Sequence, residues 1–187
     1  LPNIAKYAKD TPLRKDSLYG LDGHINYLFR DHNKNGQVDA GDGDKVILYV
    51  GMRRGGRNYY ALDVTDRNNP RYLWQIDGGS SGFERLGQTW SEPVVAKVPW
   101  NNDEKIVLLF GGGYDEAEDE AAAASSLQLG NAIYMVDAET GELLWKASKS
   151  SHDFNHADMT ASMNNNIQAI DINRDRLTDY FFVTDVA

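Results

Sequence analysis

The feature that most constrains this chain is a repeated set of short apolar runs. Runs rich in Val, Ile, Tyr and Phe alternate with clusters of Gly, Asn and Asp, a pattern typical of β-strands joined by turns. The first set of predicted strands is His24–Phe29, Lys45–Val50, Asn58–Val64 and Arg71–Ile76. The second is Pro93–Val98, Lys105–Phe110, Ala132–Asp137 and Leu143–Ala147, and a third begins with Asn166–Ile172 and Asp179–Thr184.

The sets align with one another in order. The corresponding segments are Lys45–Gly51 with Lys105–Gly111, Tyr60–Asp63 with Tyr134–Asp137, and Leu73–Trp74 with Leu144–Trp145. Repeats of four strands each predict an all-β fold built from propeller blades. An ordinary β-sandwich is the alternative.

The repeat also predicts how the chain is divided. The expected parts are a lead-in (1–23), blade-like unit one (24–77), a linker (78–92), blade-like unit two (93–148) with an acidic insertion (114–126), an interblade loop (149–165) and a partial third unit (166–187). A short helix is expected around Ile4–Ala8. The run Asp115–Ala124 is helix-like and densely negative, which favours a solvated surface insertion over a lid that binds a partner or a cation.

The segment Asp171–Asp179 has the donor spacing of a calcium loop. Oxygen-bearing side chains stand at its first, third, fifth and ninth positions, and an apolar residue stands at the seventh. A hard cation such as Ca²⁺ takes six to eight oxygen ligands, some of them backbone carbonyls. The predicted ligands are Asp171, Asn173, Asp175, the carbonyl of Leu177, and Asp179. Arg176 stands at the sixth position, where a residue other than Gly is expected to strain the turn and its charge to lower cation affinity.

A second candidate calcium loop, Asp31–Asp42, fits the pattern D-x-N-x-N-G-x-x-D. Gly36 stands at the sixth position, where a sharp turn needs positive φ. The predicted ligands are Asp31, Asn33, Asn35, the carbonyl of Gln37, Asp39 and Asp42. The alternative is a solvated hairpin, because Asn and Asp favour turns in any case. Each candidate loop falls between the first and second strands of its unit.

Other motifs favour structural roles. His152 and His156 are spaced for zinc on a helix, but the surrounding Ser, Asn and Lys residues indicate a loop. The G-x-S-x-G match at 78–82 lacks a following helical pattern, so no nucleophile elbow is expected. Thr140–Gly141 predicts a tight turn, and Trp145 is expected to pack against the neighbouring blade.

Composition limits the partners. The formal net charge of −9 argues against a nucleic-acid or anionic-membrane partner. No apolar run approaches the roughly 18 residues of a membrane span, so no membrane insertion is expected. The absence of cysteine excludes disulfides, thiolate zinc sites and cysteine nucleophiles. With no catalytic constellation in view, we expect a protein that is not an enzyme.

Several segments together resemble the C-terminal propeller of PilY-type adhesins, which sit at the tips of type IV pili. They are Lys45–Gly51, Gly55–Asp66, Tyr72–Trp74, Leu86–Pro93 and the loop Asp171–Asp179. The resemblance covers nearly all of residues 20–187, and the run from Gly55 to Asp66 is its most specific part.

The resemblance implies a modified, quinoprotein-like β-propeller on the bacterial surface, present here as two blades and part of a third. It implies a Ca²⁺-binding domain that tunes pilus function, with minor pilins at the pilus tip and host or abiotic surfaces as partners. No Arg-Gly-Asp tripeptide occurs, so integrin binding is not implied. Two alternatives stay open: a quinoprotein-type dehydrogenase, whose blade motif Asp137–Trp145 resembles, and a calcium-binding repeat scaffold like the integrin head.

Overall fold

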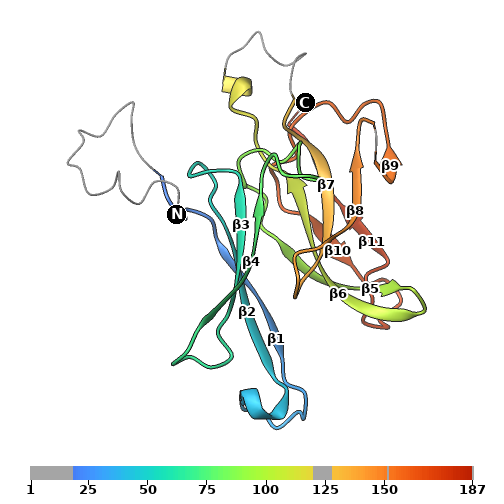
Figure 1. The fold of residues 1–187 in the computed structure, drawn as a ribbon. Helices are drawn as coiled ribbons and strands as arrows, with labels where there is room; N and C mark the ends of the chain where they lie inside the picture. The colour runs from blue at the N-terminus through green and yellow to red at the C-terminus, as the bar shows by residue number, and fades with distance from the viewer. Residues whose placement is uncertain (1–18, 120–127, 151, 187) are drawn as a thin grey trace, which may run out of the picture.

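The computed structural model describes residues 19–119, 128–150 and 152–186. These residues form separate, mainly antiparallel sheets (Figure 1). The first sheet has the order β1-β2-β3-β4. Its strands are β1 (Ile25–Arg30), β2 (Lys45–Gly51), β3 (Asn58–Asp63) and β4 (Arg71–Asp77). Each strand pairs with the next along the chain, as turns between neighbouring strands dictate.

The second sheet repeats this arrangement with one addition. Its strands are β5 (Val94–Trp100), β6 (Asp103–Gly112), β7 (Gly130–Asp137), β8 (Leu143–Ser148) and the short β9 (Phe154–Asn155), in that order. β9 runs parallel to β8 and was not predicted. A hairpin of β10 (Gln168–Ile170) and β11 (Tyr180–Phe182) follows. Every strand predicted from the repeat is present, with ends shifted by a few residues.

Helical structure among the described residues is limited to two 3-10 turns. η1 (Ala40–Asp42) lies between β1 and β2, and η2 (Glu116–Asp119) follows β6. η2 is the start of the predicted acidic helical run, and its continuation over 120–127 lies outside the described residues. The helix expected around Ile4–Ala8 lies outside them as well. No helix in the described part of the chain is long and apolar enough to cross a membrane.

The repeat in the sequence is a repeat in the structure. β3 and β7 each end in an aspartate, and these two residues take the same place in register, Asp63 opposite Ile47 and Asp137 opposite Val107. Asp63 holds its turn by accepting hydrogen bonds from Thr65 and Arg71, whose guanidinium is 2.6 Å away. Asp63 and Thr65, which belong to the run from Gly55 to Asp66, are therefore needed to close the turn after β3.

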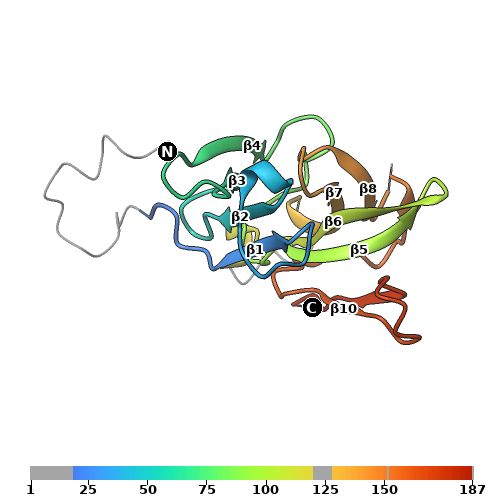
Figure 2. The ribbon, with the colours of Figure 1, turned by 90° about the horizontal axis from the view of Figure 1, so that it is seen from below.

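Successive sheets lie side by side (Figure 2), and two apolar cores fill the spaces between them. The first joins sheet one to sheet two and contains Tyr49, Trp74, Phe110 and Tyr134, all less than 9% exposed. Large aromatic side chains of this kind bury the most apolar area per residue. The second core joins sheet two to the β10–β11 hairpin.

A tryptophan on the last long strand of each sheet reaches the next unit. Trp74 of β4 lies against the β7–β8 turn, where a Cβ on Gly141 would stand 2.8 Å from its ring, and Gly141 has φ +73°. Trp145 of β8 meets Phe181 of β11 edge-on, with ring centroids 6.0 Å apart. The expected packing of Trp145 on the neighbouring unit is confirmed.

The all-β prediction is therefore confirmed. The sheets of the described residues stand in sequence and do not close into a ring. The division of the chain into blades stays a prediction.

Candidate cation-binding loops

The C-terminal loop, residues 171–179, joins β10 to β11 and turns its carboxylates toward its own backbone. Asp171 accepts the N–H of Arg174 (2.6 Å) with one oxygen and the N–H of Arg176 (2.8 Å) with the other. Asp179 accepts the N–H of Ile172 (2.8 Å), so the last residue of the loop is tied to the second. These bonds close the loop into a tight turn, with the carboxylate oxygens of Asp171 and Asp179 facing its backbone N–H groups.

The N-terminal loop, residues 31–44, joins β1 to β2 and repeats this scheme. Asp31 accepts the N–H of Asn35 (3.2 Å) and that of Gly36 (2.8 Å). In both loops the third side chain accepts the N–H of the fifth residue, and the fifth side chain accepts the N–H of the seventh. These bonds are Asn173–Asp175 (2.9 Å), Asp175–Leu177 (2.8 Å), Asn33–Asn35 (3.1 Å) and Asn35–Gln37 (2.7 Å).

The backbone angles of the two loops also agree. The fourth and sixth residues are left-handed in each, with φ +59° at Lys34, +77° at Gly36, +65° at Arg174 and +74° at Arg176. Only Gly adopts this conformation without a steric penalty, which for other residues is about 1 kcal/mol or more. The expectation that Arg176 stands where Gly is preferred is confirmed.

Sequence reasoning missed Asp44. This residue is 3% exposed and accepts the N–H groups of His32 (2.8 Å) and Asp39 (2.9 Å). The bond from His32, the second residue of this loop, to Asp44 corresponds to the bond from Ile172, the second residue of the C-terminal loop, to Asp179. The N–H groups of Asp39 and then His32 lower the pKa of the Asp44 carboxyl, so it is ionised at neutral pH.

A signal for Asp44 was present in the sequence. Asp44 directly precedes β2, as Asp179 directly precedes β11. The N-terminal loop is longer because η1 is inserted ahead of its closing aspartate. Counting positions from Asp31 therefore led to Asp42 instead of Asp44.

The two remaining predicted ligands take part in the loop in another way. Asp39 caps η1 by accepting the N–H of Gly41 (2.8 Å), and Asp42 accepts a bond from the side-chain amide of Asn33 (2.8 Å). In the described ranges no three His, Asp or Glu side chains gather into a preformed metal site. The loop carboxylates are instead occupied by N–H groups, so their roles as ligands stay predictions.

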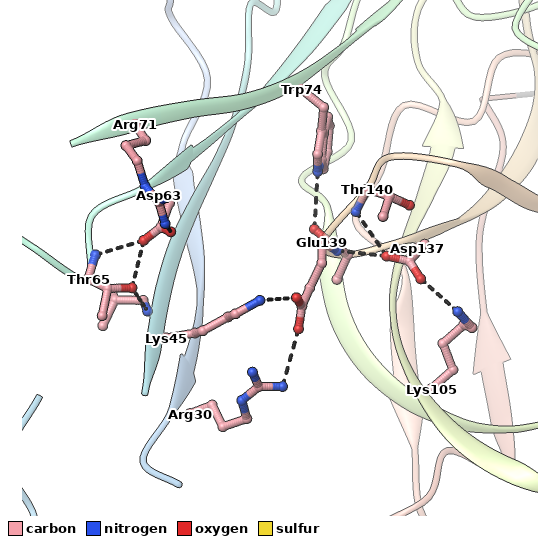
Figure 3. A network of polar contacts seen from close by, with 12 residues as sticks. Arg30, Lys45, Asp63, Thr65, Arg71, Trp74, Lys105, Asp137, Glu139 and Thr140 are labelled. Carbon is pink, nitrogen blue, oxygen red and sulfur yellow. Dashed lines mark hydrogen bonds and ion pairs between the residues drawn. The ribbon is translucent and has the colours of Figure 1, made fainter. Parts of the chain in front are cut away.

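Both loops are attached to sheet two. Arg30 and Lys45, which flank the N-terminal loop, both bind the Glu139 carboxylate in the β7–β8 turn, and Arg30 Nη1 is 3.2 Å from it (Figure 3). The same turn is fixed by Lys105, whose ammonium is 2.7 Å from Asp137. In the C-terminal loop, Thr178 N–H donates to the carbonyl of Lys97 on β5 (2.7 Å). Each loop thus spans the junction between two units.

The other candidate motifs have the structural roles expected of them. His152 and His156 lie on either side of β9, so they do not share the helix face that their spacing would give on a helix. Residues 78–82 form a turn with positive φ at Gly79 and Gly82. No helix follows that turn in the described residues, so it is no nucleophile elbow.

Comparison with known proteins identifies the relatives of this chain. It is 32% identical over 101 residues to the type IV pilus biogenesis factor PilY1 of Pseudomonas aeruginosa, and 33% identical over 99 residues to a PilY1 homologue of Xylella fastidiosa. This chain is homologous to PilY1. The matched residues are 54% and 53% of this chain but only 7% and 8% of those relatives. No family model matches the chain.

The fold agrees with that relationship. The crystal structure of the PilY1 C-terminal domain of P. aeruginosa superposes with a TM-score of 0.59, covering 88% of this chain and 28% of that one at 22% identity. The all-β arrangement described above is therefore the fold of a part of that domain. PilY1 proteins are named as pilus biogenesis factors and not as enzymes. The resemblance to PilY-type proteins is confirmed.

Proposed function

We propose that this chain is a calcium-binding β-propeller segment of a type IV pilus protein, and that calcium tunes pilus function and surface attachment. The single observation that carries the proposal is the pair of loops with one hydrogen-bonding scheme at equivalent hairpins of a PilY1 homologue. The role is not enzymatic, and its location is the bacterial surface, at the pilus tip or outer membrane. Minor pilins and host or abiotic surfaces are the proposed partners.

The propeller part of the proposal rests on how the sheets repeat. Two up-and-down sheets share strand order, register and a tryptophan that reaches the next unit. Each sheet packs its face on the following one, as blades do. The β10–β11 hairpin has the place of the first two strands of a third blade.

The calcium part rests on donor chemistry. All the side chains predicted as metal ligands in the loops are carboxylates or amides, whose oxygens are the hard ligands that Ca²⁺ prefers. The C-terminal loop would hold the ion through Asp171, Asn173, Asp175, the Leu177 carbonyl and Asp179. The N-terminal loop would use the predicted set of Asp31, Asn33, Asn35, the Gln37 carbonyl, Asp39 and Asp42, and we add Asp44 to it.

Calcium would act on the junctions between units. Because Arg30 and Lys45 tie both ends of the N-terminal loop to Glu139, rigidity gained in that loop is transmitted to sheet two. The Thr178–Lys97 bond gives the C-terminal loop the same connection. Occupied loops therefore favour one fixed arrangement of the units, which is the arrangement that pilus partners would meet.

The test is a thermal unfolding series with increasing CaCl₂ after chelation. Binding to the folded state alone stabilises it by about 2.7 kcal/mol when calcium is at 100 times its dissociation constant. We expect Asp175→Ala combined with Asp179→Ala to remove the gain due to the C-terminal loop. Asp158→Ala, which changes an aspartate with a 91% exposed side chain outside both loops, should keep the full gain. An unfolding temperature that stays constant up to millimolar calcium would overturn the proposal.

A further inference from the structure

A cleft of about 390 Å³ lies where the linker between the two sheets meets both of them. Short antiparallel bridges join Arg53 to Thr89 and Gln88 to Tyr114, so the linker is bonded to the end of β2 on one side and to the segment after β6 on the other. Gln88 and Thr89 are buried at 9% and 2% exposure. The floor of the cleft is therefore a fixed backbone ladder.

Aromatic rings form the walls of this cleft. Trp90 and Tyr114 meet edge to face with centroids 6.4 Å apart. Tyr19 contributes a third ring, 38% exposed, and the Arg54 guanidinium lies 5.9 Å from it and 5.5 Å from Trp90. Arg53 stacks on the Trp90 ring at 4.2 Å. Contacts on several sides hold the Trp90 ring in one position.

Polar groups of the cleft are fixed by bonds to one another. Trp90 Nε1 donates to the Gln88 amide oxygen (3.0 Å), and the Gln88 amide nitrogen donates to Glu116. The Tyr114 hydroxyl donates to Asp119 (2.7 Å), and this bond raises the pKa of Tyr114 to about 12. Glu116 and Asp119 are exposed, and each carboxylate keeps acceptor sites beyond the one bond described.

The charges of the lining limit the ligand. Arg53 and Arg54 would repel a cation, and Arg53 already stacks on one face of the Trp90 ring. Glu116 and Asp119 would repel an anion. A ligand suits both sets of charges when it carries no net charge, has hydroxyl groups that donate and accept hydrogen bonds, and can place an apolar face on an aromatic ring.

We propose that this cleft binds a neutral sugar, of the size of one or two hexose rings. The C–H face of a pyranose packs on the Trp90 and Tyr114 rings, and its hydroxyls donate to Asp119 and Glu116. Arg54 and Asn164 supply hydrogen-bond donors to the sugar oxygens. The volume lies within the ~300–1,000 Å³ of ordinary ligand sites. None of the calcium-loop residues lines the cleft, so the inference goes beyond the proposed function and does not depend on it.

The experiment is saturation-transfer NMR on the 187-residue chain with methyl glycosides of glucose, galactose, mannose, N-acetylglucosamine and N-acetylgalactosamine. At least one should bind, and Trp90→Phe should weaken that binding by at least about tenfold because the larger ring is lost. Tyr114→Phe removes one hydroxyl and Asp119→Asn removes one negative charge, both with little change of side-chain shape, so they report on the cleft even where Trp90→Phe folds poorly. Each is expected to weaken binding several-fold.

Trp100→Phe is the matched control, because Trp100 lies at the far end of β5 and outside the cleft. It should leave sugar binding unchanged. The proposal is overturned where no glycoside binds more tightly than about 10 mM, where glucosamine or sialic acid binds better than every neutral sugar, or where the cleft variants bind like Trp100→Phe.

Discussion

Glu139 offers the most direct test of how the units are joined. Its carboxylate binds Lys45 and Arg30, the residues on either side of the N-terminal loop, although both are far from it in sequence. The backbone of its turn is held independently, because Tyr49 and Trp74 both donate to the carbonyl of Ala138 (3.1 and 3.2 Å). Replacing Glu139 by Ala therefore removes the ion pairs and leaves the turn in place.

The expected magnitude follows from exposure. The side chains of Arg30, Lys45 and Glu139 are 38%, 34% and 34% exposed, so solvent screens the pairs in part. Pairs of this kind contribute about 0.2–1 kcal/mol each, so two that share one carboxylate give about 0.4–2 kcal/mol. For a chain of this size that corresponds to a drop in unfolding temperature of roughly 1–8 °C.

Urea unfolding at low salt and at 1 M NaCl measures this contribution. Glu139→Ala should lower the free energy of unfolding by about 0.4–2 kcal/mol at low salt, and by less at 1 M NaCl, where the Debye length is about 3 Å. Glu142→Ala is the matched control, since Glu142 is an exposed carboxylate of the same turn, and it should stay within about 0.5 kcal/mol of the parent. Equal effects of the two variants, or a loss independent of salt, would refute the reasoning.

Three further predictions concern other parts of the chain. Backbone N–H groups and the Lys146 ammonium lower the pKa of Glu84 to about 2 from its usual 4.5. The ionised Glu84 carboxylate therefore stabilises the fold fully above pH 4.5, and this stabilisation is lost as the pH falls toward 2. In urea unfolding, Glu84→Gln should cost stability at pH 6 and almost none at pH 2, and an equal cost at both would contradict this. Arg176→Gly should raise calcium affinity and Gly36→Arg should lower it, because both residues are left-handed and hold the sixth position of a proposed calcium loop. Calorimetry that finds no change in either variant would contradict this. Trp145→Ala should destabilise the docked β10–β11 hairpin by about 2 kcal/mol, half the value for a fully buried Trp. Amide hydrogen exchange should become faster at Phe181 and its neighbours but not in β1–β2, and unchanged exchange would argue against the contact.

Much of the fold could be predicted because each strand carries its own local signal. Alternating apolar residues and turn residues mark segments such as Lys45–Val50 without reference to the rest of the chain. β9 carries no such signal, since two residues pair with β8 only once the sheet exists. Strand-level prediction succeeds where the determinant is local.

The sites show the same division. The side chains that shape the turns of both loops follow a spacing within one segment, so their gathering in each loop could be predicted, whereas Asp44 was missed because η1 displaces it from the expected count. The Glu139 contacts and the Trp90 cleft could not be predicted, because the contacting residues come from different sheets and the linker. Such sites depend on the packing of units, which no short motif encodes.

Anomalous diffraction from crystals grown with CaCl₂ tests directly whether both loops bind calcium. We expect one anomalous peak within residues 171–179, ligated by Asp171, Asp175 and Asp179, and a second within residues 31–44. A peak missing from either loop at saturating calcium would show that this loop does not bind the ion.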